Sequence, residues 1–408
     1  MEFKKVTLGE ISVNSRGYYG IGASAVDFDP NLPTYLRITD INDDGSINKD
    51  NLKSIKEEDY EKYILKENDI VFARTGNSTG RNYFYEKKDG LLVFAGFLIK
   101  FSLDKEKVFP KYIKYVCQSK EYWGWINSIA TGSTRKNINA KMYEKMPIFL
   151  PEEKTQEKIV TLLESLDSKI EINNKIISNL ESQAQAIFKS WFVDFEPFQD
   201  GNFVESELGM IPEGWEVKEL GELFKFVKGK KPKDLHEKYE DNFIPYIVKG
   251  VMDGSETPKF TNEINIVKIK KLDCFMLMDG ANSGNIYYGY DGALGSTFAL
   301  LESKNQVYRE LIYWKLKINE SIIKNQNTGS AIPHANKDFI NKMNVAIPIN
   351  IEENEILKTL ENFRIKINSL NSQNTKLAEL RDALLPKLMA GEIDVSNIKI
   401  EGEEVKNE

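Results

Sequence analysis

The chain of 408 residues repeats itself, and this internal repeat constrains the fold more than any other feature of the sequence. Three stretches recur, each given with its second copy: Leu8–Glu10 with Leu220–Glu222, Asp69–Gly80 with Asp273–Gly284, and Thr131–Ser133 with Thr328–Ser330. The offset between the copies falls from 212 to 204 to 197 along the chain. Such a steady fall is expected if the second copy lost short loop segments from one ancestral unit. The sequence therefore predicts two similar modules in tandem.

Each copy divides into a globular module and a long helix. The module mixes short β-type runs such as Ile70–Ala73 with Gly and Asn turns, and one amphipathic helix is expected near Lys111–Trp125. A long helical pattern follows Pro151 and Pro348. The predicted fold class is α+β, with two tandem α/β modules separated by two long helices. The expected segments are modules at 1–151 and 220–348, helices at 152–196 and 349–393, a linker at 197–219 and an acidic tail at 394–408.

Seam residues in the two helices step by four and three positions, which is the 3.5-residue period of a coiled coil. The first seam is Ile159, Leu163, Leu166, Ile170, Asn173, Ile177, Leu180, Ala184, Ile187 and Trp191. The second seam is Ile356, Leu360, Phe363, Ile367, Leu370, Asn374, Leu377, Arg381, Leu384 and Leu388. A helix that packs only on its own module would show a wider apolar stripe. We therefore expect the helices to pair as an antiparallel coiled coil.

A polar residue in each seam, Asn173 and Asn374, predicts the register of this pair. In an antiparallel pair, the numbers of facing residues have a constant sum, which is 547 when the two asparagines face each other. A slip of one heptad would leave at least one buried amide against an aliphatic side chain, at about 1 to 3 kcal/mol per unsatisfied group. The two asparagines therefore select one register. Proline interrupts helical hydrogen bonding, so Pro386 leaves open the alternative that the regular helix ends before Leu388.

The charge is unevenly distributed along the chain. A net charge of −7 argues, taken alone, against a nucleic-acid binder. Lys plus Arg and Asp plus Glu number 23 and 20 in 1–151, 6 and 15 in 152–219, 18 and 15 in 220–348, and 8 and 12 in 349–408. The two modules are thus mildly basic, and they are the parts expected to meet phosphate. The alternative is that these differences reflect only solvated surfaces.

Two polar loops in each module are the candidate nucleic-acid contacts. Arg and Asn read guanine and adenine edges through paired hydrogen bonds, and hydroxyls and glycine amides suit phosphates. The first loop offers Arg74, Asn77, Ser78, Thr79, Arg81 and Asn82, and its second copy offers Asn282, Ser283 and Asn285. The second loop offers Thr131, Ser133, Thr134, Arg135 and Lys136, and its second copy offers Thr328, Ser330, His334 and Lys337. Polar surface turns are the alternative. Recurrence with changed polar residues favours a shared scaffold with two specificities.

Motifs for catalysis and for cofactor binding are missing from the sequence. It contains no G-x-x-x-x-G-K-[ST], H-E-x-x-H or G-x-S-x-G, and no Asn-Pro-Pro-Tyr motif for adenine methylation. Gly20–Ala25 spells GxGxxA, but Pro30 and Pro33 interrupt the helix that a dinucleotide site requires. Two cysteines and two histidines do not support a zinc site. We predict no metal, no cofactor and no catalysis in this chain.

The same features indicate where the chain works. Cys117 and Cys274 lie far apart, as in proteins of a reducing compartment. No run approaches the roughly 20 apolar residues that a membrane span needs, and the N-terminus has no apolar core for export. We expect a soluble, cytoplasmic chain.

Three phrases carry a family resemblance. They are Ser190–Pro197 (SWFVDFEP), Ser206–Trp215 (SELGMIPEGW) and Leu380–Ile393 (LRDALLPKLMAGEI). They resemble the ends of the two helical regions, and the link between them, in the DNA specificity (S) subunits of type I restriction-modification systems. The resemblance covers essentially the whole chain. It implies two target recognition domains joined by an antiparallel helical pair.

The resemblance also implies partners and a role. A specificity subunit binds double-stranded DNA without catalysis and binds two methyltransferase (M) subunits, which modify adenine with S-adenosylmethionine. Restriction (R) subunits complete an ATP-dependent nuclease, so S-adenosylmethionine, ATP and Mg²⁺ are expected on partner subunits. Recognition loops vary with the target, so the candidate contacts rest on their own chemistry. Two other functions stay open: a self-contained adenine-N6 DNA methyltransferase, and a coiled-coil scaffold without sequence-specific DNA binding.

Overall fold

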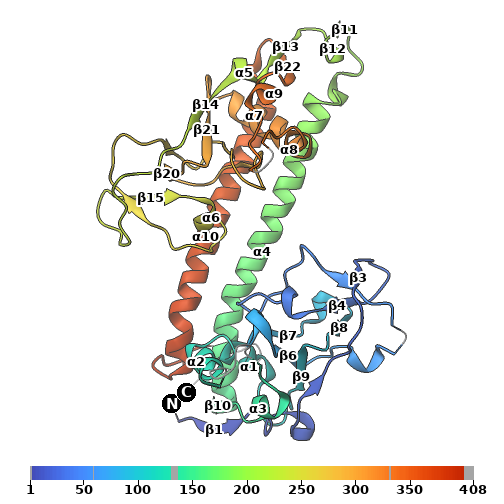
Figure 1. Ribbon diagram of the computed structural model, residues 1–408, viewed down its shortest axis with the longest axis vertical. Helices are drawn as coiled ribbons and strands as arrows, with labels where there is room; N and C mark the ends of the chain where they lie inside the picture. The colour runs from blue at the N-terminus through green and yellow to red at the C-terminus, as the bar shows by residue number, and fades with distance from the viewer. Residues whose placement is uncertain (1, 58, 130–136, 330–331, 399–408) are drawn as a thin grey trace, which may run out of the picture. The chain divides into compact units, whose positions relative to one another are not determined.

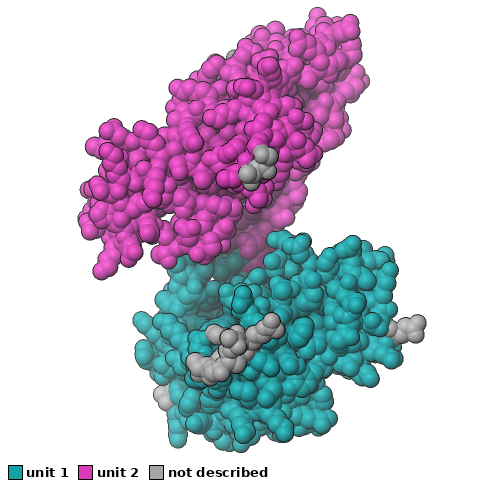
Figure 2. All heavy atoms as spheres, in the orientation of Figure 1, with its two compact units in different colours: residues 1–170, 375–408 teal, residues 171–374 magenta. Residues whose placement is uncertain are grey.

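The computed structural model describes residues 2–57, 59–129, 137–329 and 332–398. The chain forms two compact units, coloured teal and magenta in Figure 2. Unit 1 contains residues 1–170 and 375–408, and unit 2 contains residues 171–374. Each unit combines one globular α/β part with portions of both long helices (Figure 1). The predicted α+β class is therefore confirmed, whereas the six segment boundaries stay a prediction.

The globular part of unit 1 contains two four-stranded sheets, ordered β2-β9-β6-β7 and β3-β5-β4-β8, and a β1–β10 pair. Its strands are β1 Lys4–Thr7, β2 Tyr18–Tyr19, β3 Val26–Asp27, β4 Thr34–Leu36, β5 Lys53–Ser54, β6 Asp69–Ala73, β7 Asn82–Phe84, β8 Leu92–Phe94, β9 Leu98–Ser102 and β10 Pro147–Leu150. Its helices are α1 Pro110–Val116, α2 Lys120–Ile129 and α3 Ala140–Glu144. Strand β6 is buried along its whole length, so the polar loop that follows it leaves from a rigid support.

Unit 2 repeats this topology. Its sheets are ordered β14-β21-β18-β19 and β16-β15-β20-β17, with a β13–β22 pair. The strands are β13 Trp215–Glu219, β14 Phe224–Lys228, β15 Ile244–Ile247, β16 Phe260–Thr261, β17 Lys268–Ile269, β18 Phe275–Leu277, β19 Ile286–Tyr287, β20 Gly292–Leu294, β21 Phe298–Ser303 and β22 Asn344–Pro348. The helices are α5 Leu220–Leu223, α6 Lys249–Met252, α7 Tyr308–Ile318, α8 Glu320–Asn325 and α9 Lys337–Asn341, and the linker forms a hairpin of β11 Phe203–Ser206 and β12 Gly209–Pro212. The predicted internal repeat is thus confirmed in the first sheet, in the strand pair and in three strands of the second sheet, whereas the edge strands β3 and β17 have no counterpart among the described strands of the other unit.

Equivalent glycines explain the GxGxxA stretch. A Cβ on Gly20 would lie 2.3 Å from the carbonyl oxygen of Ala95, and a Cβ on Gly229 would lie 2.2 Å from that of Gly295. Both glycines allow the same close approach of two backbone segments. The first glycine of the stretch therefore serves the scaffold.

The single amphipathic helix expected near Lys111–Trp125 was wrong. The chain forms two helices there, since α1 ends at Val116 and α2 begins at Lys120. The Ser119 hydroxyl accepts a hydrogen bond of 3.2 Å from the backbone N–H of Tyr122 and so caps the start of α2. A serine cap in the middle of an apolar pattern explains the break.

The long helices are α4, Glu153–Phe192, and α10, Glu355–Met389 (Figure 1). Every predicted seam residue is buried or half-buried. In unit 1 the start of α4 shares a core with the end of α10, through Ile159, Leu163 and Leu388. In unit 2 the end of α4 shares a core with the start of α10, through Ala184 and Leu360. The helices are therefore antiparallel within each unit, as predicted.

The regular helix does not end at Pro386. Helix α10 continues through Pro386 to Met389, and the Ala390 N–H donates a 2.9 Å hydrogen bond to the Pro386 carbonyl. A proline inside a helix removes one helical hydrogen bond and crowds the preceding turn, so other contacts must hold the helix together here. Leu385 and Leu388 are buried in the core of unit 1, and this packing holds the last turn in place.

The two seam asparagines meet, as the predicted register requires. Asn173 is fully buried, and its Nδ2 donates a 2.8 Å hydrogen bond to Oδ1 of Asn374. Asn374 Nδ2 in turn donates a 2.8 Å bond to Oδ1 of Asn174. In unit 1, Arg381 of α10 donates a 3.1 Å bond to the carboxylate of Asp167 of α4.

Among the described residues, no helix is both long and apolar enough to cross a membrane.

A buried ion pair joins the globular part of unit 2 to α10. Arg364 and Glu310 are each about 3% exposed, and Arg364 Nη2 lies 2.7 Å from Glu310 Oε2. The guanidinium carbon also lies 4.1 Å from the ring centroids of both Tyr288 and Tyr313. Burial lowers the pKa of Arg364, but the Glu310 carboxylate raises it overall, so the guanidinium stays charged.

We predict that the asparagine pair selects the helix register. Asn173→Leu alone should lower the free energy of unfolding by about 1 to 3 kcal/mol, because the Asn374 carbonyl loses its donor. Asn173→Leu combined with Asn374→Leu should recover most of this loss, because both partners become apolar. Urea unfolding of the three variants measures these changes.

Disulfide trapping tests the register itself. Ile177→Cys with Leu370→Cys joins facing positions in the observed register, whereas Ile177→Cys with Phe363→Cys matches a slip of one heptad. The first pair should cross-link in the otherwise native chain, and the second pair only when both asparagines are leucine. Cross-linking of the second pair in the native background would contradict the prediction.

We also predict that Arg364→Met destabilises unit 2 by about 3 to 5 kcal/mol, because it leaves the Glu310 carboxylate buried without a partner. Arg364→Met combined with Glu310→Leu should be much closer to the native chain in stability. Urea unfolding followed by tryptophan fluorescence provides the measurement. A double variant as unstable as Arg364→Met would show that the charge pair is not the cause.

Candidate nucleic-acid interface

In each unit, a backbone bridge joins the first candidate loop to a residue in or next to the second. In unit 1, Thr75 of the first loop forms a backbone bridge with Asn137, which follows the second loop. In unit 2, Asp279 forms the corresponding bridge with His334. The offsets of 204 and 197 between these residues are those of the sequence repeat. In each unit the bridge therefore joins segments about 60 residues apart in the sequence.

Arg74 is a half-buried candidate cation in unit 1. It follows β6, and its backbone is fixed on both sides, by the carbonyl of Phe97 and by the N–H of Ile138. Its guanidinium carbon lies 5.0 Å from the ring centroid of Tyr19, and the Tyr19 hydroxyl accepts a 3.1 Å bond from the N–H of Ala140. Within the described residues, Arg74 Nε is buried without a hydrogen-bond partner. The tyrosine ring thus orients the guanidinium of this half-buried arginine.

Arg81 is engaged within its own unit. Its Nε donates a 2.6 Å bond to Asp43 Oδ1, and its Nη1 donates a 3.1 Å bond to the carbonyl of Ile41. The carboxylate of Asp43 neutralises the arginine, and the carbonyl fixes its position. Arg81 therefore braces the loop, and less of its hydrogen-bonding capacity remains for a phosphate or a base.

Three other candidates of the first loop are buried, and only Asn77 is exposed. The amide of Asn82 is 3% exposed and donates a 3.1 Å bond to the carbonyl of Cys117. The Thr79 hydroxyl donates a 2.7 Å bond to the Gly76 carbonyl, and Ser78 is also buried. Because these side chains point into the unit, we leave Ser78, Thr79 and Asn82 out of the proposed interface.

Unit 2 presents different chemistry at the corresponding place. His334 is exposed, and its Nδ1 lies 2.7 Å from Oδ1 of Asp279. Thr328 is exposed beside it and exchanges two backbone hydrogen bonds with His334. Asn282 and Lys337 are also exposed, and Lys337 Nζ lies 5.6 Å from the ring centroid of Phe226. This surface therefore combines a carboxylate, an imidazole, an amide and one cation, where unit 1 offers arginine.

Two candidates of unit 2 have other roles. Ser283 is fully buried, and its hydroxyl accepts a 2.7 Å bond from Asn327 Nδ2, so it supports the loop. Asn285 is half-buried and donates a 3.1 Å bond to the Tyr287 hydroxyl. The remaining candidates lie outside the described residues: Thr131, Ser133, Thr134, Arg135, Lys136 and Ser330. They stay a prediction.

Sequence reasoning missed two functional neighbours. Tyr19 lies some 55 residues from Arg74, and no short-range pattern joins them. Asp279 lies in the repeated stretch Asp273–Gly284, yet only its pairing with His334 gives it a role. The repeat held a signal for the second case, because Thr75 and Asp279 occupy equivalent positions and so do Asn137 and His334.

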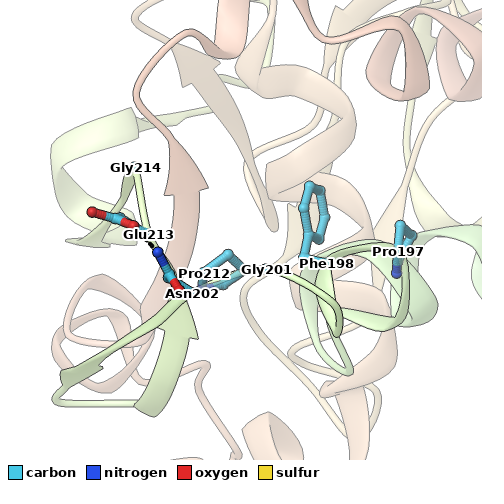
Figure 3. Close-up of a pocket in the computed structure, with 7 residues that line it drawn as sticks. All are labelled: Pro197, Phe198, Gly201, Asn202, Pro212, Glu213 and Gly214. Carbon is cyan, nitrogen blue, oxygen red and sulfur yellow. Dashed lines mark hydrogen bonds between the residues drawn. The ribbon is translucent and has the colours of Figure 1, made fainter.

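Neither the hollow in the linker nor the two cysteines indicate a catalytic site. A hollow of about 500 Å³ lies in the linker, between Phe198, Gly201 and the turn at Glu213 (Figure 3). Asn202 and Glu213 use their polar groups on each other there, through a 3.0 Å side-chain bond and a 2.9 Å backbone bond. No group of three metal-ligating side chains occurs within the described ranges. Burial raises the pKa of both cysteines, Cys274 to about 11, which makes them poor nucleophiles.

Comparison with known proteins identifies the family of this chain. The model of the type I restriction modification DNA specificity domain matches residues 2–182 and 212–380, one block for each copy of the repeat. The type I restriction enzyme HindI specificity subunit of Haemophilus influenzae is 23% identical over 481 residues, which cover 96% of this chain and 100% of that relative. The MjaIX specificity subunit of Methanocaldococcus jannaschii is 28% identical over 317 residues and 72% of each chain.

A third relative, the MjaVIII specificity subunit of Methanocaldococcus jannaschii, is 33% identical over 195 residues, or 47% of this chain, and the match spans less than half, 45%, of that protein. The crystal structure of the S subunit of a type I restriction-modification system from M. genitalium has the same fold, with a TM-score of 0.61 and 18% identity over 95% of this chain and 96% of that one. The curated relatives are named as specificity subunits, which agrees with the expectation that this chain is not an enzyme. Because the family model covers most of the chain in two blocks, this chain belongs to the family of type I restriction-modification DNA specificity subunits.

Proposed function

We propose that this chain recognises a bipartite sequence in double-stranded DNA and that each unit reads one half. The main support is the repeated pairing of two polar loops, through the bridges Thr75–Asn137 and Asp279–His334, on equivalent scaffolds with different side chains. A shared scaffold with different side chains is what two separate base preferences require. The proposed interface consists of Arg74, Asn77, Asp279, Asn282, Thr328, His334 and Lys337, whereas Arg81 supports its loop.

The side chains suggest how the two halves differ. Arg74 carries the planar donor fork that reads the two acceptors of guanine in the major groove. In unit 2, Asp279 accepts hydrogen bonds and is suited to the exocyclic amine of cytosine, while His334 and Asn282 add a ring and an amide. Lys337 suits a phosphate, which contributes affinity without sequence preference.

The long helices serve protein partners in this proposal. Residues 152–219 carry 15 acidic against 6 basic residues, and residues 349–408 carry 12 against 8. Such a surface repels the phosphate backbone and remains free for protein contacts. We propose that it holds two methyltransferase (M) subunits, to which restriction (R) subunits are added. The cofactors S-adenosylmethionine, ATP and Mg²⁺ then belong to those subunits.

We predict that co-expression with the cognate methyltransferase subunit yields adenine methylation at a split motif. The motif should have two short defined halves and an undefined gap, because two separate surfaces read it. Methylome sequencing of cells with and without the gene for this chain measures the motif.

Methylome sequencing and two assays on the purified chain separate the alternatives. A continuous motif would contradict recognition by two units. Methyl transfer by the purified chain alone would identify a self-contained methyltransferase, and DNA binding without any sequence preference would identify a scaffold.

We predict that Arg74→Ala relaxes one position in one half of the motif and leaves the other half unchanged. A lost paired base contact costs about 1 to 3 kcal/mol of discrimination at that position. Arg81→Ala should instead lower the free energy of unfolding by about 1 kcal/mol and keep the base preference, because it removes bonds to Asp43 and Ile41. Binding selection from a randomised DNA library, together with urea unfolding, measures both effects.

Two tyrosine variants provide a matched control. Tyr19→Phe keeps the ring under Arg74 and should keep its base preference, whereas Tyr19→Ala removes the ring and should weaken that preference. His334→Ala should change only the opposite half of the motif. Equal selection profiles for Arg74→Ala and the native chain would exclude Arg74 as a reader.

A further inference from the structure

A polar cavity of about 260 Å³ opens in unit 2, and Asn285 at the end of the first loop is one of its lining residues. Side chains from α4, α7, α8 and α10 and from the segment around β19 line it. The residues that carry its chemistry are Glu181, Asn285, Tyr313, Lys317, Glu320 and Asn368. Because all of them belong to one compact unit, the cavity is a property of that unit alone.

Two buried carbonyl oxygens at this cavity have no hydrogen-bond partner among the described residues. Asn368 is only 7% exposed, and its Nδ2 donates a 3.0 Å bond to the carbonyl of Lys271. That bond fixes the orientation of the amide, because a flipped amide would set two oxygens against each other. Oδ1 of Asn368 is therefore a buried acceptor without a donor, and Oδ1 of Asn285 is another. A ligand that bonds to both oxygens must donate hydrogen bonds.

The charges at the cavity also favour a cation. Glu320 accepts a 3.0 Å bond from the N–H of Ile286 and bonds of 3.1 and 3.2 Å from Lys317 Nζ, so these two charges are paired. Glu181 stands at the exposed rim and has no hydrogen bond or ion pair within the part of the chain that the structure describes. Nearby protein displaces some of its water and raises its pKa, although Lys317 lowers it. One carboxylate thus remains without a counter-charge.

The aromatic walls add no charge of their own. Burial raises the pKa of Tyr288 and of Tyr313, so both hydroxyls stay neutral at physiological pH. Their rings meet edge to face, with centroids 5.0 Å apart, and hold Arg364 behind the cavity. Because Arg364 is paired with Glu310, it does not neutralise Glu181.

The equivalent place in unit 1 already contains an ammonium group. Helices α1 and α7 correspond, and matching Ile113 with Ile312 sets Lys114 at the position of Tyr313. Lys114 Nζ lies 2.6 Å from Oε1 of Glu86, which follows β7 as Tyr290 follows β19. Unit 1 therefore supplies an ammonium group from α1, whereas α7 of unit 2 has Tyr313 at that position and its Lys317 is bonded to Glu320.

We propose that the cavity of unit 2 binds a primary ammonium group, with Asn368 Oδ1, Asn285 Oδ1 and the Glu181 carboxylate as its acceptors. The group belongs either to a free polyamine or to a lysine side chain of a partner protein. Both sources offer the same three N–H donors and one positive charge. The proposal does not depend on DNA recognition, because the chain alone is sufficient for binding.

Calorimetric titration of the full-length chain tests this. The probes are cadaverine, spermidine and N-acetyl-lysine amide, with N-acetyl-norleucine amide as the neutral match and N-acetyl-arginine amide as the planar cation. We expect at least one of the ammonium probes to bind and the norleucine probe not to bind. Stronger binding of the amines points to a polyamine, and stronger binding of the lysine probe points to a partner side chain. Equal affinity for the norleucine or arginine probe would overturn the assignment to ammonium.

Variants locate the site. Glu181→Gln should weaken ammonium binding about tenfold or more, because it removes the unpaired charge at an exposed position that the fold does not require. Asn285→Asp keeps the side-chain shape and adds a charge, and the Tyr287 hydroxyl can donate to the new carboxylate, so it should strengthen binding if the chain stays folded by circular dichroism. Glu361→Gln removes one charge from α10 outside the cavity and is the matched control. Equal affinity of the native chain and Glu181→Gln, or equal losses in Glu181→Gln and Glu361→Gln, would overturn the proposal.

Discussion

The pairing of α4 with α10 is the interaction on which the rest of the structure depends. Each compact unit contains the globular part of one repeat and portions of both helices, so neither unit is complete without chain segments far apart in sequence. The fully buried Asn173 makes a bond across this pair that a shift by one heptad would break. A buried amide contributes less to stability than a leucine would, but it distinguishes one alignment from its neighbours.

Charge also matches each globular part to its own helix segment. In unit 2, Glu310 of α7 meets Arg364 of α10. At the equivalent positions in unit 1 the signs are reversed, with Lys111 on α1 and Asp167 on α4, and Lys111 pairs with Glu164 at 2.7 Å. An exchange of the two globular parts would therefore bring like charges together in the low-dielectric contact between module and helix.

The same scaffold supports different surfaces because buried residues, and not the exposed ones, stabilise the loops. Buried residues at the bases of the loops, such as Asn82 and Ser283, use their polar groups on the backbone or on neighbouring side chains of their own unit. The exposed positions are then free to differ, as Arg74 on its tyrosine ring differs from the Asp279–His334 pair. Paired loops on rigid strands allow the reading surface to change without changing the fold.

The sequence by itself determined the repeat, the fold class, the helix pair and its register, because these depend on periodic apolar positions and on the two asparagines. It also identified the loops, since glycines and polar residues recur at fixed offsets. Only the tertiary structure decided which loop residues face outward, because burial depends on contacts across tens of residues. Asn82 against Cys117, Arg81 against Asp43 and Arg74 on Tyr19 are such contacts. For the same reason, the continuation of α10 through Pro386 followed from the core of unit 1, which outweighed a local preference.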